Sequence, residues 1–313
     1  MSDVLARAGR TTASVVRAFC SPGGLCGAGI ELAWSATHLA LYPLGFSEER
    51  PGSCRDVNSL QGLPPLQRGL LFEDVEAAGT PILLVHGLID NRSIFTVLRR
   101  GLRRRGFGRV LTLNYSVFTH DIPQAAERLG ERVEELCAET GYERIHLVGH
   151  SLGGVIARYY VQRLGGHERV HTLATLGSPH AGTHAAWLLP RRIVRQLRPG
   201  SAVMQELAAP AAGCRTRFLA VYSDIDHLML PTRVARIDHP DLRARNVLLH
   251  GVGHMSLPCD PRVVREIVNV MAHLDEDGST VVRGVTSIDS DPATGAHEET
   301  ELAPVGAEVA PAG

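Results

Sequence analysis

The sequence predicts an α/β protein whose mostly parallel central sheet carries helices on both faces. From about residue 80 onward, short apolar runs alternate with longer segments in which apolar residues recur at helical spacing. A run such as PILLVHG (81–87) is apolar almost throughout, as expected for a strand buried on both faces. Strands and helices that alternate in this way are typical of a parallel sheet.

The alternation gives six predicted strands and four predicted helices. The strands cover 81–87, 109–115, 144–150, 170–178, 217–223 and 246–252. The helices cover 93–105, 122–140, 152–164 and 261–274. Segment 122–140 shows the pattern clearly, because its apolar residues recur on one helical face: Ala125, Leu129, Val133, Leu136 and Cys137.

The chain divides into one predicted domain and two flanking regions. The α/β domain covers residues 71–274, and residues 1–70 form an N-terminal apolar segment followed by a Pro- and Gly-rich linker arm. The acidic tail, 275–313, has no sustained apolar period and is predicted to be disordered. An insert at about 180–213 is predicted to form a lid or cap, with a plain surface excursion as the alternative.

Composition argues against nucleic-acid and zinc-ribbon functions. The formal net charge of −1 gives no global field that would attract nucleic acid. The six cysteines are scattered and form no CxxC pair, so we expect no metal site of the zinc-ribbon type.

The N-terminal segment bears on location. Glu31 interrupts the first apolar stretch, and Pro43 with Gly45 weakens the second, so neither is predicted to span a membrane. A secretory signal is disfavoured, because the apolar core would be Gly-rich and no small-x-small cleavage site stands out. We therefore expect a cytoplasmic protein, with peripheral membrane contact through this segment or the lid as an open alternative.

A G-x-S-x-G motif, Gly149 to Gly153, marks the candidate nucleophile, Ser151. The apolar strand IHLV leads into the motif and the helix LGGVIARYY follows it, so the serine stands on a sharp strand-to-helix turn. Such a turn projects the hydroxyl from the sheet edge, while the helix N-terminus favours negative charge beside it. The alternative is a Ser–Gly turn without chemistry.

A serine hydroxyl needs a general base, and that base needs a carboxylate to orient it. His254 is the preferred base, because it follows a predicted strand in a loop at the carboxyl edge of the sheet. Asp226 is preferred to Asp224 as the acid, and both follow the strand RFLAVYS. His250 ends its strand and is expected to be structural.

The remaining candidate site residues surround the nucleophile. The backbone N–H groups of Leu88 and Leu152 are predicted to form the oxyanion hole. The candidate substrate-binding residues are His86, Gly87, His150 and His180.

Four segments together resemble the α/β-hydrolase superfamily, and within it bacterial, particularly actinobacterial, triacylglycerol lipases and esterases. They are VHGLIDN, GHSLGG, LGSPHAGT, and YSDIDHLMLP with GVGHMSLP. The resemblance implies an α/β-hydrolase fold with 71–274 as its catalytic domain, a triad of Ser151, Asp226 and His254, and no metal or organic cofactor. It also implies a carboxylester hydrolase acting on an ester or acyl-lipid substrate.

Two other classes of function stay open at this point. The same triad could serve a thioesterase, an acyltransferase or an amidase. The fold could also serve a binding protein without turnover, because a fold alone does not establish a function.

Overall fold

A parallel sheet of seven strands forms the middle layer of the structure, a computed structural model that describes residues 29–33, 79–88, 90–113, 121–272 and 284–288. The strand order is β2-β1-β3-β4-β5-β6-β7, and every neighbouring pair is parallel. The strands are β1 (Ile82–Val85), β2 (Val110–Leu113), β3 (Ile145–His150), β4 (Val170–Leu176), β5 (Arg217–Ser223), β6 (Arg243–Leu249) and β7 (Gly284–Ile288).

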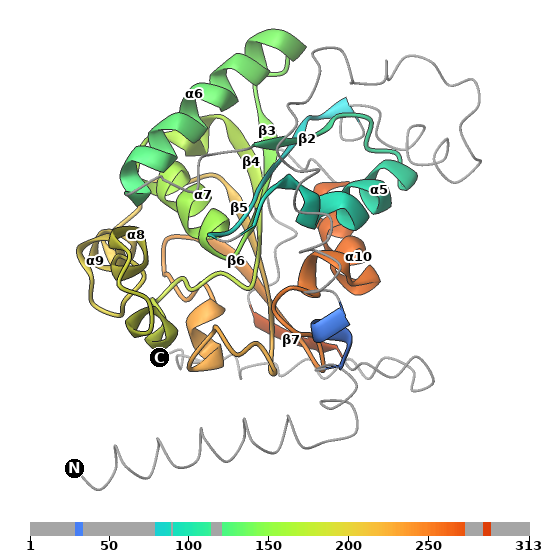
Figure 1. Cartoon of the computed structure of the whole chain (residues 1–313). Coiled ribbons are helices and arrows are strands. Elements are labelled where there is room, and N and C mark those ends of the chain that lie inside the picture. The colour runs from blue at the N-terminus through green and yellow to red at the C-terminus, as the bar shows by residue number, and fades with distance from the viewer. Residues whose placement is uncertain (1–28, 34–78, 89, 114–120, 273–283, 289–313) are drawn as a thin grey trace, which may run out of the picture.

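Helices cover both faces of this sheet, as the sequence predicts (Figure 1). One face carries α6 (Ile122–Thr140) and α7 (Leu152–Arg163), and the other carries α5 (Thr96–Arg104) and α10 (Pro261–Met271). The predicted mostly parallel sheet with helices on both faces is thereby confirmed. Other short helical turns in the described residues include η2 (Arg92–Phe95), η3 (Gly166–Glu168), η5 (Thr232–Ala235) and η6 (Leu257–Cys259).

The apolar run of β1 shows why this sequence forms a central strand. Leu83 and Val85 belong to the core on the α6 and α7 side, whereas Ile82 and Leu84 belong to the core beneath α5 and α10. Successive side chains of a strand point to opposite faces, so burial on both sides requires an unbroken apolar sequence. All four side chains are at most 1% exposed.

Two strands differ from the sequence prediction. β6 begins at Arg243, three residues before the predicted start. The apolar run from which the strand is predicted does not extend to this beginning, because polar, partly exposed residues interrupt it there. β7 lies in the tail predicted to be disordered, and it pairs with β6 at the edge of the sheet. Its sequence contains Val285, Thr286 and Ile288, which are β-branched and suit a strand. The other tail residues, from 275 onward, lie outside the described residues, as does most of the predicted arm at 1–70.

The predicted insert is a folded excursion between β4 and β5. It contains η4 (His184–Trp187), α8 (Arg192–Arg195) and α9 (Ala202–Ala208). Its buried side chains join the core beneath α6 and α7: Ile193, Val194, Leu197, Val203, Met204 and Leu207. The role of the insert as a lid stays a prediction.

The buried side chain of Arg158, on α7, connects this insert to the domain through hydrogen bonds. Its side chain is 4% exposed and donates hydrogen bonds to the carbonyl oxygens of His180 (3.1 Å) and Leu207 (2.9 Å) and to Gln162 Oε1 (2.6 Å). The buried guanidinium thus satisfies carbonyl groups at both ends of the insert, and Gln162 Nε2 is a second, more distant donor to the carbonyl oxygen of Leu207 (3.4 Å).

Three general features of the described residues bear on function. No helix among them is long and apolar enough to cross a membrane. They contain no cluster of three or more metal-ligating side chains. The described cysteines, Cys137, Cys214 and Cys259, are free thiols.

We expect Arg158→Met to lower the free energy of unfolding by roughly 2 kcal/mol, because it leaves the buried carbonyl group of His180 without its donor and that of Leu207 with only the longer hydrogen bond from Gln162 Nε2 (3.4 Å). Urea denaturation followed by circular dichroism measures this change. Arg163→Met is the matched control: Arg163 lies on the same helix, is more exposed, and donates to the carbonyls of Ala209 and Pro210. Equal losses in the two variants would contradict a special role for the buried guanidinium.

Candidate active site

Ser151 stands between β3 and α7 in a backbone conformation that few residues adopt. Its φ is 54° and its ψ is −122°, and it is the one non-glycine residue with a positive φ in the described part of the chain. Its N–H donates to the carbonyl oxygen of Leu176 at the end of β4 (2.9 Å). A strained conformation of this kind persists only where the surrounding structure enforces it.

The glycines of the motif allow that turn. A Cβ on Gly153 would lie 2.2 Å from the carbonyl oxygen of Val85, and a Cβ on Gly149 would lie 2.4 Å from the Cα of Gly154. No side chain larger than hydrogen fits at either position. The two glycines therefore let α7 start directly against the end of β1, with Ser151 at the carboxyl edge of the sheet.

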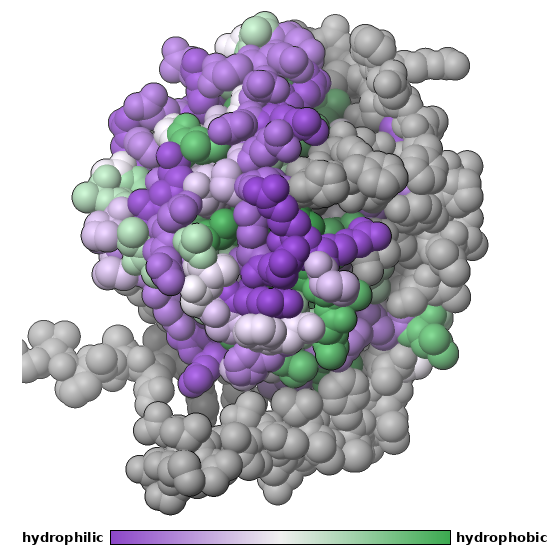
Figure 2. All heavy atoms as spheres, turned by 60° about the vertical axis from the view of Figure 1, so that its left-hand side comes forward, coloured by the Kyte–Doolittle hydropathy of each residue, from purple (hydrophilic) through white to green (hydrophobic). Residues whose placement is uncertain are grey.

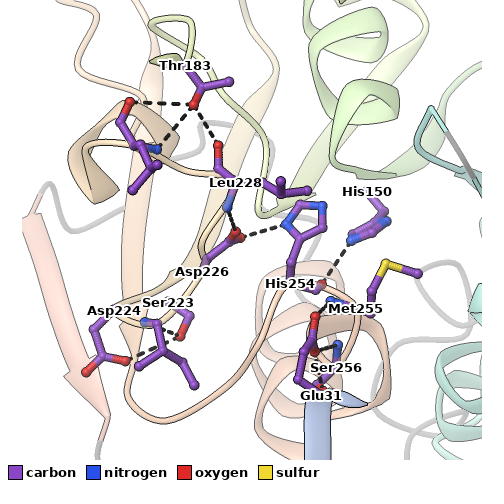
Figure 3. A network of polar contacts seen from close by, with 12 residues as sticks. Glu31, His150, Thr183, Ser223, Asp224, Asp226, Leu228, His254, Met255 and Ser256 are labelled. Atoms are coloured by element: carbon purple, nitrogen blue, oxygen red, sulfur yellow. Dashed lines mark hydrogen bonds and ion pairs between the residues drawn. The ribbon is translucent and has the colours of Figure 1, made fainter. Parts of the chain in front are cut away.

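His254 and Asp226 form a buried pair at the same edge (Figure 3). His254 Nδ1 donates to Asp226 Oδ2 at 2.7 Å, and the two side chains are 1% and 0% exposed. Asp226 Oδ1 accepts the N–H of Leu228 (3.0 Å), and the carbonyl oxygen of Leu228 accepts the Thr183 hydroxyl (2.6 Å). The carboxylate is thus held from the other side by the start of the insert.

Asp224 forms a second pair, with His250. The distance from His250 Nδ1 to Asp224 Oδ2 is also 2.7 Å, but the side chains are 33% and 26% exposed. Burial raises the pKa of Asp224, and the hydrogen bonds from His250 and the Gly251 N–H outweigh that effect, so its pKa is lowered. Of the two carboxylates, Asp226 is the one that contacts the candidate base, and its role as the acid of a triad stays a prediction.

The surroundings of His254 favour its protonated form. Burial lowers the pKa of this histidine, but the negative charges of Asp226, Asp90 and Glu31, with the hydrogen bond to Asp226, raise it further than burial lowers it. The net result is a raised pKa. An imidazolium formed in this site is therefore stabilised, which is the property that a general base requires once it has accepted a proton.

His150 braces the backbone of His254. Its ring is fully buried, with Nδ1 2.9 Å from Asp90 Oδ2 and Nε2 3.1 Å from the carbonyl oxygen of His254. The ring centroids of His150 and His254 are 4.8 Å apart. These contacts of His150 lie within the protein, and its predicted contact with substrate stays a prediction.

The candidate nucleophile and the candidate base are related through His150. Ser151 directly follows His150, whose ring packs against that of His254. Within the described residues, no hydrogen bond joins the Ser151 hydroxyl to the His254 ring. The link between these two side chains is therefore proposed from their placement and from the freedom of a serine hydroxyl to rotate about χ1.

The predicted oxyanion groups flank Ser151. A Cβ on Gly87 would lie 3.1 Å from the Cβ of Ser151, so the loop after β1 that contains Leu88 runs beside the nucleophile. Leu152 is the first residue of α7, where N–H groups have no acceptor within the helix. This arrangement is compatible with the predicted oxyanion hole, and the roles of both residues stay predictions.

The two remaining substrate-binding candidates are buried histidines. His86 Nδ1 lies 2.9 Å from the carbonyl oxygen of Gly87, and His180 Nε2 lies 2.9 Å from the Thr175 hydroxyl. Burial, followed by the charge of Arg158, lowers the pKa of His180 well below its usual value. His180 therefore stays neutral near pH 7, and direct contact of either ring with substrate stays a prediction.

Three polar residues of the site are not singled out by sequence reasoning. Asp90 lies in the segment VHGLIDN, but nothing in its spacing shows that it meets His150. Thr183 ends the segment LGSPHAGT and contacts a loop 45 positions later. One feature of the sequence could have identified Glu31: it is a lone carboxylate in an apolar stretch, and a buried carboxylate is usually paired.

The chain is similar to known hydrolases in sequence and in structure. Residues 80–213 match a family model described as alpha/beta hydrolase fold. A triacylglycerol lipase of Pseudarthrobacter phenanthrenivorans is 32% identical over 114 residues, 34% of this chain and 35% of the relative. A triacylglycerol lipase of Vibrio cholerae is 31% identical over 133 residues, 41% and 40% of the two chains. The match thus spans well under half the length of these curated relatives.

The structural neighbours support the fold. The crystal structure of a Bacillus licheniformis lipase in propeptide form has a TM-score of 0.52 at 17% identity, covering 64% of this chain and 51% of the neighbour. A gene product of Listeria innocua has a TM-score of 0.52 at 16% identity, covering 67% of this chain and 99% of the neighbour. At these identities the likeness concerns the fold alone.

We expect Asp226→Asn to lower the pKa of His254, because it removes the charge that contributes most to raising it. A pH titration of the histidine ring resonances by NMR measures this shift. Asp224→Asn is the matched control, since it removes the same charge from the neighbouring Asp–His pair. A larger shift of the His254 pKa in the control than in Asp226→Asn would reverse the assignment of the two carboxylates.

Proposed function

Because the chain is an α/β-hydrolase-fold protein with partial similarity to bacterial triacylglycerol lipases, we propose that it hydrolyses carboxylic esters with Ser151 as the nucleophile. The observation that carries this proposal is the strained Ser151 turn beside a buried Asp226–His254 pair. That combination supplies a projecting hydroxyl and an oriented base, which are the two requirements for forming an acyl-enzyme.

The proposed mechanism has two half-reactions. In the first, His254 Nε2 accepts the proton of Ser151 Oγ as that oxygen attacks the ester carbonyl, and the N–H groups of Leu88 and Leu152 bind the resulting oxyanion. The protonated His254 then gives its proton to the departing alcohol. In the second, His254 takes a proton from water as the water oxygen attacks the acyl carbon. The bond from that carbon to Ser151 Oγ then breaks, His254 returns the proton to Oγ, and the acid leaves. Throughout, Asp226 holds Nδ1–H and stabilises the imidazolium.

The exposed surface of the insert favours acyl lipids as substrates. Trp187, Leu188 and Leu189 are 62%, 81% and 42% exposed, and the exposed Arg191, Arg192 and Arg195 follow. Arg198 places its guanidinium 4.1 Å from the Trp187 ring centroid. We call this set the insert patch. Apolar side chains stand out in green on the mostly hydrophilic side of the molecule that Figure 2 brings forward.

The insert patch combines apolar side chains with positive charge, the pairing that suits the surface of an anionic lipid aggregate. We therefore include in the proposal that a cytoplasmic form of the protein contacts membranes peripherally through this patch. An ester in such an aggregate would then reach the carboxyl edge of the sheet from the side of the insert.

We expect wild-type protein to hydrolyse p-nitrophenyl esters, and Ser151→Ala to lower kcat by about 10⁴-fold or more with the fold unchanged. Asp226→Asn should cost roughly 10³-fold or more, whereas Asp224→Asn should cost less than about tenfold, because its pair is partly exposed and weak. Steady-state kinetics over short to long acyl chains, with and without micelles, measures both the rates and the chain-length preference.

The same assays separate the alternatives. Faster turnover of acyl-CoA than of oxygen esters would indicate a thioesterase, and transfer of the acyl group to an added alcohol would indicate an acyltransferase. Amide hydrolysis in preference to ester hydrolysis would indicate an amidase. Absence of any turnover by folded wild-type protein would favour a binding protein.

We expect the protein to co-sediment with vesicles containing phosphatidylglycerol more than with phosphatidylcholine vesicles, and less at high salt because the charges are screened. The double variant Leu188→Gln/Leu189→Gln should lose most of this binding while keeping hydrolysis of soluble short-chain esters. Leu164→Gln is the matched control, since Leu164 is 39% exposed just after α7. Equal binding by wild type and the double variant would exclude the insert patch as the contact.

A further inference from the structure

Glu31 reaches the loop that carries His254 from a distant part of the chain. It belongs to a short helix at 29–33, and its Oε1 accepts the N–H of Met255 at 2.7 Å. Its Oε2 accepts both the N–H (2.9 Å) and the hydroxyl (2.7 Å) of Ser256. Figure 3 shows the carboxylate beneath these two residues, which immediately follow the histidine.

The loop is shaped to admit this carboxylate. A Cβ on Gly253 would lie 2.3 Å from Glu31 Oε2, so a residue with a side chain at this position would displace Glu31. Glu31 therefore contacts the backbone on both sides of His254. From the opposite direction, His150 Nε2 lies 3.1 Å from the carbonyl oxygen of His254.

We propose that Glu31 is a positioning residue for His254: its three hydrogen bonds fix the loop from Gly253 to Ser256 so that the imidazole keeps its place between Asp226 and Ser151. The proposal rests on the proposed esterase function. Glu31 lies outside the range 80–213 that matches the family model, so this contact adds a part of the chain that the match does not cover. In this proposal Glu31, which lies before the matched range, takes part in the candidate active site.

The charge of Glu31 gives this role a second, separable consequence. The charged or titratable groups that face His254 are Asp226 after β5, Asp90 after β1, His150 at the end of β3, and Glu31. The carboxylate of Glu31 is among those that raise the pKa of His254 against the effect of burial. Removing its charge should therefore lower the pH at which the imidazole becomes a free base.

The test compares Glu31→Gln with wild type, using kcat per site titrated with a fluorophosphonate. We expect kcat to fall about 10- to 100-fold from misplacement of the base, with KM changed far less and the acid limb of kcat/KM moved to lower pH. Hydrogen exchange at the amides of Met255 and Ser256 should become faster. Glu135→Gln is the matched control, because it removes one exposed charge on α6 and should leave all these readouts unchanged.

Other outcomes overturn the proposal in distinguishable ways. An unchanged kcat per titrated site with an unmoved acid limb would show that Glu31 does not position His254. If wild-type protein has no turnover, the proposed function fails, and unchanged amide exchange in Glu31→Gln would separately refute the contact. If Glu31→Gln does not fold, Ser256→Ala provides the test, because it removes one of the three hydrogen bonds and keeps the charge of Glu31. We expect Ser256→Ala to lower kcat per site and to leave the acid limb of kcat/KM unmoved. An unchanged kcat in this variant would overturn the proposal.

Discussion

The backbone of Ser151 is the constraint around which the rest of the site is built. A serine with a φ of 54° is strained by roughly 1–3 kcal/mol, so neighbouring contacts must hold it there. The close approach of Gly153 to Val85 and the hydrogen bond to Leu176 supply that support. Val85 ends β1 and Leu176 ends β4, and these two strands flank β3. The contacts that hold Ser151 in its strained conformation therefore come from the centre of the sheet, where strands are buried on both faces.

Parallel strands explain how residues far apart in sequence meet. The loops after β1, β3, β5 and β6 all leave the same edge of the sheet, and these strands are close neighbours in the order observed. Around one imidazole this edge collects the carboxylates of Asp226, Asp90 and Glu31. Such a concentration of negative charge is costly in a buried site unless a proton or hydrogen bonds compensate for it, and here backbone N–H groups and His254 do so.

Much of the fold follows from pattern, and less of the site does. The sheet and its helices are predictable from the apolar runs of β1 and β3 and from the helical period of 122–140. The beginning of β6 and the whole of β7 are not, because polar residues begin β6 and an acidic, polar sequence surrounds β7. Chain order and strand ends suffice to propose Ser151, Asp226 and His254. The Asp90–His150 and Glu31–Ser256 contacts depend on tertiary packing across many positions, which local periodicity does not encode.

Labelling with a fluorophosphonate, mapped by peptide mass spectrometry and followed as a function of pH, tests the central claim that Ser151 and His254 act as one unit. We expect a single adduct on Ser151 of the folded chain, formed at a rate that rises as His254 loses its proton and that collapses in His254→Ala. An adduct on another residue, no adduct at all, or a labelling rate indifferent to both pH and the histidine would contradict that claim.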